Sequence, residues 1–300
     1  MSPFRLLPSW LIAGCLVVAT GTAATLKDHA REHPLSLFVA RKGAVMPNAF
    51  DQTNNLKEGD RALLLSGLGL TDLSGLSELM VDDDGVRRPI TAVANLHLFL
   101  NQNRIQALPD EIGRLKNVKF LYLENNLLTT LPRALLEMYA LEGMYYTANR
   151  FTAVPAFVYT MTRLKKLQFS RNQLTELPPE IGQLTELRHL NFAGNRIPVV
   201  PSTVARLTRL RVCDLSDNLI RELPVEFGTV AIVNQLRVRN NPLTTLPAGF
   251  AAMRATIDIT GTNIDPEKLT PELRAKISTE KPPGSKEEDK IIVRSPPKVK

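Results

Sequence analysis

The sequence is poor in cysteine, histidine, tryptophan and aromatic residues generally. Its 300 residues include two cysteines, four histidines, one tryptophan and 6% aromatic residues. Cys15 lies in a segment that we expect to be cleaved, so Cys213 would remain alone and no intramolecular disulfide is predicted. With 44% hydrophobic residues but few aromatics, the chain should fold around small aliphatic side chains in many stacked layers.

The charge is also modest and dispersed. The formal net charge is +7, and the lysines and arginines are scattered along the chain. A dedicated nucleic-acid platform would concentrate them on one element. We therefore expect no nucleic-acid partner.

The first 24 residues have the layout of a secretory signal peptide. One cation, Arg5, precedes an apolar run from Leu6 to Ala19, and small residues follow around Ala23. The run is too short for a confident membrane span. Residues 1–24 are predicted to direct export, which places the mature protein in the periplasm or outside the cell.

A second interpretation of this segment remains open. Ile12-Ala13-Gly14-Cys15 resembles the bacterial lipobox, in which the cysteine is lipidated and becomes the mature N-terminus. The apolar residues continue past Cys15, unlike the usual layout. A membrane-anchored lipoprotein is the alternative localisation, and a membrane contact is expected only if Cys15 carries the lipid.

A 23-residue repeat dominates the rest of the chain. An asparagine recurs at this interval, and a proline follows each asparagine by six residues, from Pro109 to Pro247. Leucines or other apolar residues occupy positions three and five before each asparagine, as Leu121 and Leu123 do. The repeated asparagines are Asn103, Asn126, Asn149, Asn172, Asn195, Asn218 and Asn241.

This pattern, LxxLxLxxNxLxxLPxxIxxL, resembles the leucine-rich-repeat family over residues 61–264. The resemblance implies an α/β solenoid, a horseshoe with a parallel β-sheet on its concave face and short helical or irregular convex segments. It also implies a protein-binding scaffold, and we expect a monomer. The alternation of inward leucines gives each coil one short strand, and the asparagines form a structural ladder between coils.

The repeat defines the predicted domains. After the signal peptide, residues 25–60 should cap the first coil, and residues 61–264 should form about nine coils with an insert near 74–93. Residues 265–279 are predicted to form a closing helix, and residues 280–300 a basic, disordered tail.

Catalytic and metal-binding patterns are weak. His29 and His33 are four residues apart but have no evident third ligand, and Asp82, Asp83 and Asp84 are consecutive rather than alternating. Cys213 takes an inward apolar position of its repeat, which predicts a buried thiol. We predict no cofactor, no metal and no enzymatic activity.

Residues two, four and six positions before each asparagine should point out of the concave face. They divide into an aromatic N-terminal half and a polar, net basic C-terminal half. We predict that a protein or peptide partner binds there, through Phe99, Phe120, Tyr122, Tyr145, Lys166, Gln168, His189, Asn191, Asp214, Arg237 and Arg239.

Three alternatives stay open at this point. The N-terminal segment or the 74–93 insert could cover the aromatic residues. A glycan or peptidoglycan fragment could replace the protein partner, because aromatic rings stack on sugars. The protein could also be a purely structural envelope lipoprotein anchored at Cys15.

Overall fold

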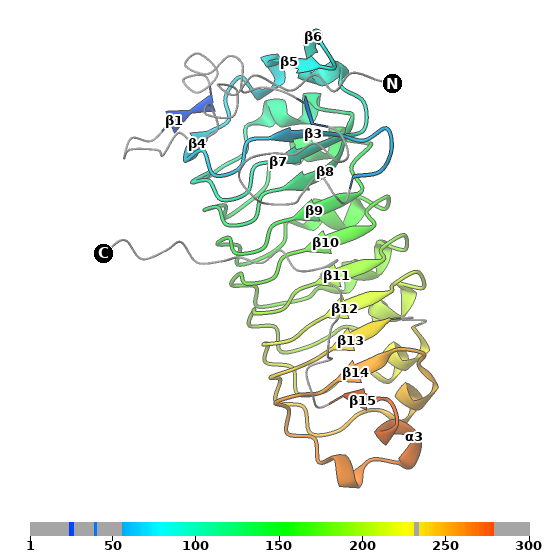
Figure 1. Cartoon of the computed structure of the whole chain (residues 1–300). Helices are drawn as coiled ribbons and strands as arrows, with labels where there is room; N and C mark the ends of the chain where they lie inside the picture. Colours follow the sequence, from blue (N-terminus) through cyan, green and yellow to red (C-terminus); the bar gives the residue numbers. More distant parts are fainter. Residues whose placement is uncertain (1–23, 27–38, 41–55, 231–233, 279–300) are drawn as a thin grey trace, which may run out of the picture.

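The chain forms an elongated solenoid whose coils stack from one end to the other (Figure 1). The computed structural model describes residues 24–26, 39–40, 56–230 and 234–278. The signal peptide, Cys15, His29, His33 and the tail from residue 280 lie outside the described residues. No helix among those described is long and apolar enough to cross a membrane.

One long sheet of short strands runs along the solenoid. Its order is β15-β14-β13-β12-β11-β10-β9-β8-β7-β3-β2, and all neighbours are parallel except β2 and β3. The strands are β2 (Val39–Ala40), β3 (Arg61–Leu64), β7 (Leu96–Phe99), β8 (Val118–Tyr122), β9 (Gly143–Tyr145), β10 (Lys166–Gln168), β11 (His189–Asn191), β12 (Val212–Asp214), β13 (Gln235–Arg237), β14 (Thr256–Asp258) and β15 (Ile277–Ser278).

The register repeats the 23-residue period. Leu167 of β10 pairs with Leu190 of β11, which lies opposite Cys213 of β12. All three side chains are fully buried. Because every coil places its inward residue at the same height, the aliphatic side chains form one continuous core, as the repeat predicts.

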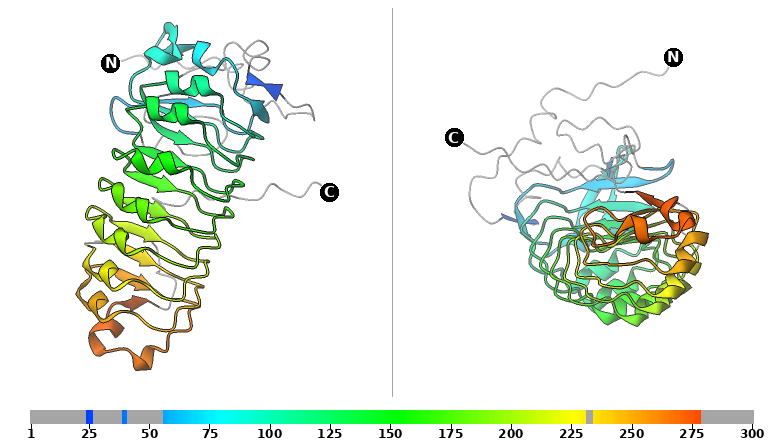
Figure 2. Two further views of the ribbon diagram at one scale, coloured as in Figure 1. Left: turned by 180° about the vertical axis from the view of Figure 1, so that it is seen from behind. Right: turned by 90° about the horizontal axis from the view of Figure 1, so that it is seen from below.

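The opposite side of each coil is a single turn of 3-10 helix, and these turns stack on the convex face (Figure 2). Seven five-residue turns each follow the repeat proline, which sits at their N-terminal boundary in extended conformation. They are η4 (Asp110–Arg114), η5 (Arg133–Glu137), η6 (Ala156–Thr160), η7 (Pro179–Gln183), η8 (Ser202–Arg206), η9 (Val225–Thr229) and η10 (Ala248–Ala252). The predicted leucine-rich-repeat fold is confirmed.

The insert near residues 74–93 folds as a small unit at the N-terminal end. After η2 (Leu76–Glu78), the antiparallel strands β5 (Met80–Asp83) and β6 (Val86–Pro89) form a hairpin, and η3 (Ile90–Ala92) follows. Asp84 and Gly85 turn the hairpin with φ of 65° and 79°. Asp83 is buried, 2.9 Å from Arg61 Nε, whereas Asp82 is half-buried and Asp84 is exposed.

β1 (Ala24–Thr25) pairs with β4 (Leu70–Asp72) in a separate two-stranded sheet at the same end. The C-terminal end differs from its prediction. Instead of one closing helix, the chain forms η11 (Pro266–Lys268), a single α-helical turn α3 (Pro271–Arg274) and then β15, which pairs with β14. Leu269 and Leu273 are buried against the last coil, so this segment closes the core while extending the sheet.

Candidate binding surface on the concave face

The repeated asparagines hold the end of each strand in place. Asn195 illustrates the arrangement: its amide nitrogen donates to the carbonyls of Phe169, one coil earlier, at 3.0 Å and of Phe192 at 2.9 Å. Its Oδ1 accepts from the backbone amide of Leu174 at 3.0 Å. The same bonds recur at Asn126, Asn149, Asn172, Asn218 and Asn241. These bonds connect each coil to the preceding one.

Residues between the inward leucines face the concave side, and their exposure differs between the two halves of the sheet. Around Gln168, Asn191, Asp214 and Arg237 the strands β10–β13 alternate a half-buried residue with a fully buried one. In β7 every residue is buried, and in β9 as well. β8 retains half-buried residues between these two closed strands, and an uninterrupted run of strands with half-buried outward residues begins at β10.

The aromatic residues of β7–β9 form a stack instead of an open anchor site. Ring centroids of Phe99 and Tyr122 are 4.1 Å apart, those of Tyr122 and Tyr145 are 4.4 Å apart, and both pairs are stacked. Phe99 also packs against Leu56 and Ala62. The prediction of an exposed aromatic cluster is wrong for Phe99 and Tyr145, which are 2% and 5% exposed, whereas Phe120 and Tyr122 are half-buried.

Two features explain this burial. Neighbouring strands place the middle-column rings at stacking distance, so each ring covers the face of the next. Leu56 precedes the first coil, which agrees with the alternative that the N-terminal segment covers part of the cluster. Phe120 lies over Gly143, where a Cβ would collide with its ring.

Three ionisable side chains lie close together beside this stack. His97 Nε2 lies 3.3 Å from Asp60 Oδ2, and Lys119 Nζ lies 3.4 Å from Asp60 Oδ1. Burial lowers the pKa of His97 to about 4, although the nearby Asp60 carboxylate opposes the shift. His97 is therefore neutral at pH 7, and Lys119 and Asp60 form the charged pair.

Glu124 is one of the buried polar groups of the concave side. It is 1% exposed, and neither carboxylate oxygen has a hydrogen-bond partner among the described residues. Burial raises its pKa to about 8. The carboxyl group is consequently protonated at neutral pH and adds no negative charge to the face.

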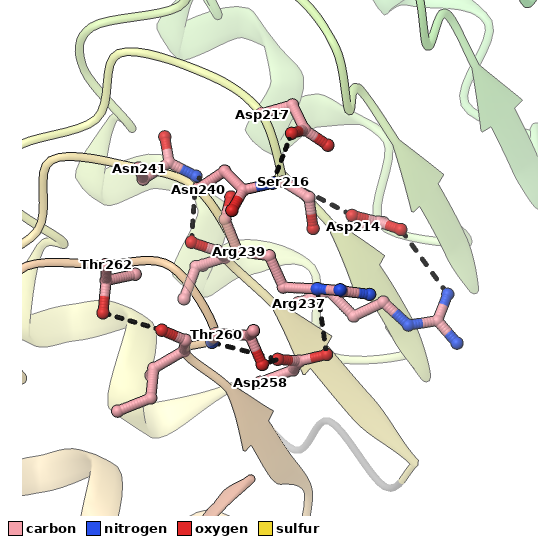
Figure 3. Close-up of polar contacts among 12 residues, drawn as sticks. Asp214, Ser216, Asp217, Arg237, Arg239, Asn240, Asn241, Asp258, Thr260 and Thr262 are labelled. Atoms are coloured by element: carbon pink, nitrogen blue, oxygen red, sulfur yellow. Dashed lines mark hydrogen bonds and ion pairs between the residues drawn. The ribbon is translucent and has the colours of Figure 1, made fainter. Parts of the chain in front are cut away.

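The C-terminal half carries a ladder of alternating charges (Figure 3). Arg237 Nη1 lies 3.5 Å from Asp214 Oδ2, and Arg239 Nε lies 3.7 Å from Asp258 Oδ2. The arginine side chains are 27% and 37% exposed. Both arginines thus have an internal carboxylate, and the predicted net basic surface is locally neutralised.

Some middle-column side chains also cap their own strands. The Oδ1 atoms of Asn191, Asp214 and Asp258 each accept a hydrogen bond from the backbone amide two residues later, at 3.0–3.1 Å. Asp214 keeps its other oxygen for Arg237. These residues have a structural task in addition to any contact with a partner.

Sequence reasoning missed Asp60 and Asp258. Asp60 precedes the first strand of the repeat, so no period points to it. Asp258 is in the middle column of the last full coil, but the preceding step is 21 residues rather than 23. The sequence does allow Asp258 to be located, because it directly follows Ile257, which aligns with the inward leucines of the repeat. In the structure Ile257 pairs with Leu236.

The described residues contain no group of three or more His, Cys, Asp or Glu side chains arranged to hold a metal. The Cys213 thiol is fully buried, and this burial raises its pKa, which disfavours the reactive thiolate. Among the described residues, the one thiol is therefore poorly placed to act as a nucleophile.

Comparison with known proteins supports the same architecture. A family model described as Leucine Rich Repeat matches residues 163–184. No curated protein matches the chain. A leucine-rich-repeat protein of Leptospira interrogans has a similar structure, with 27% identity, a TM-score of 0.59, and coverage of 70% of this chain and 57% of that one.

Two further solved structures are similar. One is the ectodomain of a plant membrane receptor kinase from Arabidopsis thaliana in complex with CASPARIAN STRIP INTEGRITY FACTOR 2, with 27% identity and a TM-score of 0.54, covering 67% of this chain and 27% of that one. The other is internalin C2 of Listeria monocytogenes, with 19% identity, a TM-score of 0.53, and coverage of 68% and 78%. The match thus spans less than two thirds of the Leptospira and Arabidopsis proteins.

Proposed function

Because the chain is a leucine-rich-repeat protein, we propose that it is a non-enzymatic scaffold that binds a protein or peptide partner on the concave face of β10–β13. The observation that carries this proposal is the alternation of half-buried variable residues with fully buried leucine or cysteine residues in these four strands. The buried residues fix the backbone, and the half-buried ones supply the contacts. A rigid surface loses little conformational entropy on binding.

The composition of this surface favours a polypeptide. Gln168 and Asn191 present amide groups in the middle column, and Arg237 presents a guanidinium group beside Asp214. Such groups can bond backbone and side-chain groups of a peptide. The Arabidopsis ectodomain, which was solved in complex with CASPARIAN STRIP INTEGRITY FACTOR 2, is a precedent for a ligand on this fold.

Site-specific photo-cross-linking in the native cell tests the proposal. A cross-linker at Asn191 should capture a discrete partner, and the Gln168→Arg substitution on the neighbouring strand should abolish that capture. The matched control places the cross-linker at Gln183, an exposed residue of η7 on the convex side. Its companion substitution is Thr185→Arg, at an exposed residue just after η7. Equal capture from Asn191 and Gln183, or capture unaffected by Gln168→Arg, would contradict binding on the concave face.

We further propose that the protein is exported, with residues 1–24 acting as the signal peptide and the mature chain located in the periplasm or outside the cell. Mass spectrometry of the mature protein should find an N-terminus near residue 24 or 25. A diacylated N-terminus at Cys15 would instead identify the membrane-anchored alternative, and retention of the intact segment would contradict both.

A further inference from the structure

A column of basic residues crosses three adjacent coils where strands β10, β11 and β12 begin. Lys165, Arg188 and Arg211 each directly precede one of these strands. Their backbones are bonded in series: the Arg188 amide donates to the Lys165 carbonyl at 2.8 Å, and the Arg211 amide donates to the Arg188 carbonyl at 2.8 Å. The three side chains therefore start from positions about 4.8 Å apart along the solenoid.

Two acidic residues of the same coils, Glu142 and Glu186, are already paired. Glu142 Oε1 lies 2.7 Å from Lys165 Nζ, at one end of the column. Glu186 forms an ion pair with Arg209. Arg188 is half-buried and Arg211 is exposed, and neither forms an ion pair with any residue that the structure describes. Two guanidinium groups thus stand on adjacent coils without a carboxylate.

Adjacent like charges on neighbouring strands are destabilising unless an anion lies between them. Guanidinium groups bind carboxylates through two parallel hydrogen bonds, so a pair of them suits a ligand with successive acidic groups. Glu142 and Glu186 are paired with Lys165 and Arg209, so the unpaired positive charge of the column is that of Arg188 and Arg211 on two adjacent coils. A narrow acidic chain can follow these two arginines.

We propose that Arg188 and Arg211, with Lys165 beside them, form a binding strip for an acidic polypeptide segment. This strip lies at the N-terminal ends of strands β10–β12. Binding to it does not depend on binding by the middle column of the concave face. In an extended peptide, alternate side chains on one face are about 7 Å apart, which long arginine side chains on adjacent coils can match.

The test uses a short fluorescent peptide of alternating Glu and Ser, titrated into the full-length protein at low ionic strength. The Arg188→Gln/Arg211→Gln variant should bind it about tenfold more weakly, as expected for two partly exposed charge contacts. Added salt should weaken binding to the wild-type protein more than binding to the variant. The corresponding Gln/Ser peptide should bind neither protein measurably.

The matched control is Arg150→Gln/Arg196→Gln. These exposed arginines follow repeated asparagines at the other end of the strands, and Gln173 occupies the same repeat position on the coil between them. This variant loses the same charge and should keep its affinity within about twofold. Equal losses in both variants, no loss in either, or preferential binding of phosphatidylglycerol vesicles through Arg188 and Arg211 would overturn the proposal.

Discussion

The two halves of the solenoid use the same concave positions for opposite purposes. In the coils of β7–β9, Phe99, Tyr122 and Tyr145 stack on one another, and His97 and Glu124 are buried in the same coils. In the coils of β12–β14, the corresponding column contains Asp214, Arg237 and Asp258. Of these, the Arg237 side chain is partly exposed to solvent. One backbone scaffold thus supports a second small core at one end and an accessible polar surface at the other.

The largest effect should come from the feature that both halves share. Replacing Asn126 or Asn218 with alanine leaves at least two backbone groups of adjacent coils without their bonds. Each substitution should lower the free energy of unfolding by about 4 kcal/mol, since each buried unpaired group costs 1–3 kcal/mol.

Urea denaturation of both variants provides the measurement. Similar losses are expected because the bond lengths in the two halves are nearly the same, at 3.0 Å to the preceding coil in each case. A loss confined to the N-terminal variant would show that the halves differ in their scaffold and not merely in their surfaces.

The second-largest effect is a pH dependence of stability, which we expect from Glu124 in the N-terminal half. Its folded pKa of about 8 lies above its ordinary value of 4.5, so the folded state retains a proton that the unfolded state loses. Stability should therefore fall as the pH rises from about 4.5 to 8. Between pH 6.5 and 9 this decline should amount to about 2 kcal/mol in the wild-type protein, and the Glu124→Gln variant should lack it.

The pH range of the measurement matters because His97 acts in the opposite direction. Its folded pKa, about 4, lies below its ordinary value of 6.5, so it removes stability as the pH falls below 6.5. Denaturation between pH 6.5 and 9 isolates Glu124. Glu142→Gln, at a partly exposed carboxylate on the next coil, is the control and should leave the slope unchanged.

The period and pattern of the sequence predict the parallel sheet, its register and the convex turns, because these depend on interactions that every repeat makes with its neighbour. They do not predict the burial of Phe99, which depends on Leu56 outside the repeat. They also miss the pairing of Arg239 with Asp258, which follows an irregular step. Contacts at the two ends of the solenoid, and contacts between residues at variable repeat positions, depend on the identity of the particular side chains. The repeat pattern does not specify these side chains, so it cannot predict their contacts.

The smallest effect on stability is expected in the C-terminal half of the solenoid, where the concave surface is accessible. Arg237→Gln removes a 3.5 Å ion pair whose arginine is 27% exposed, and such pairs contribute little, so the free energy of unfolding should change by less than about 0.5 kcal/mol. Partner capture from Asn191, two strands away, should nevertheless decrease, because Arg237 lies in the same concave column. Arg254→Gln, at an exposed arginine outside the strands, should affect neither quantity. A large stability loss in Arg237→Gln would mean that the charged ladder, like the aromatic stack, serves the fold, and the two halves would then differ in chemistry but not in purpose.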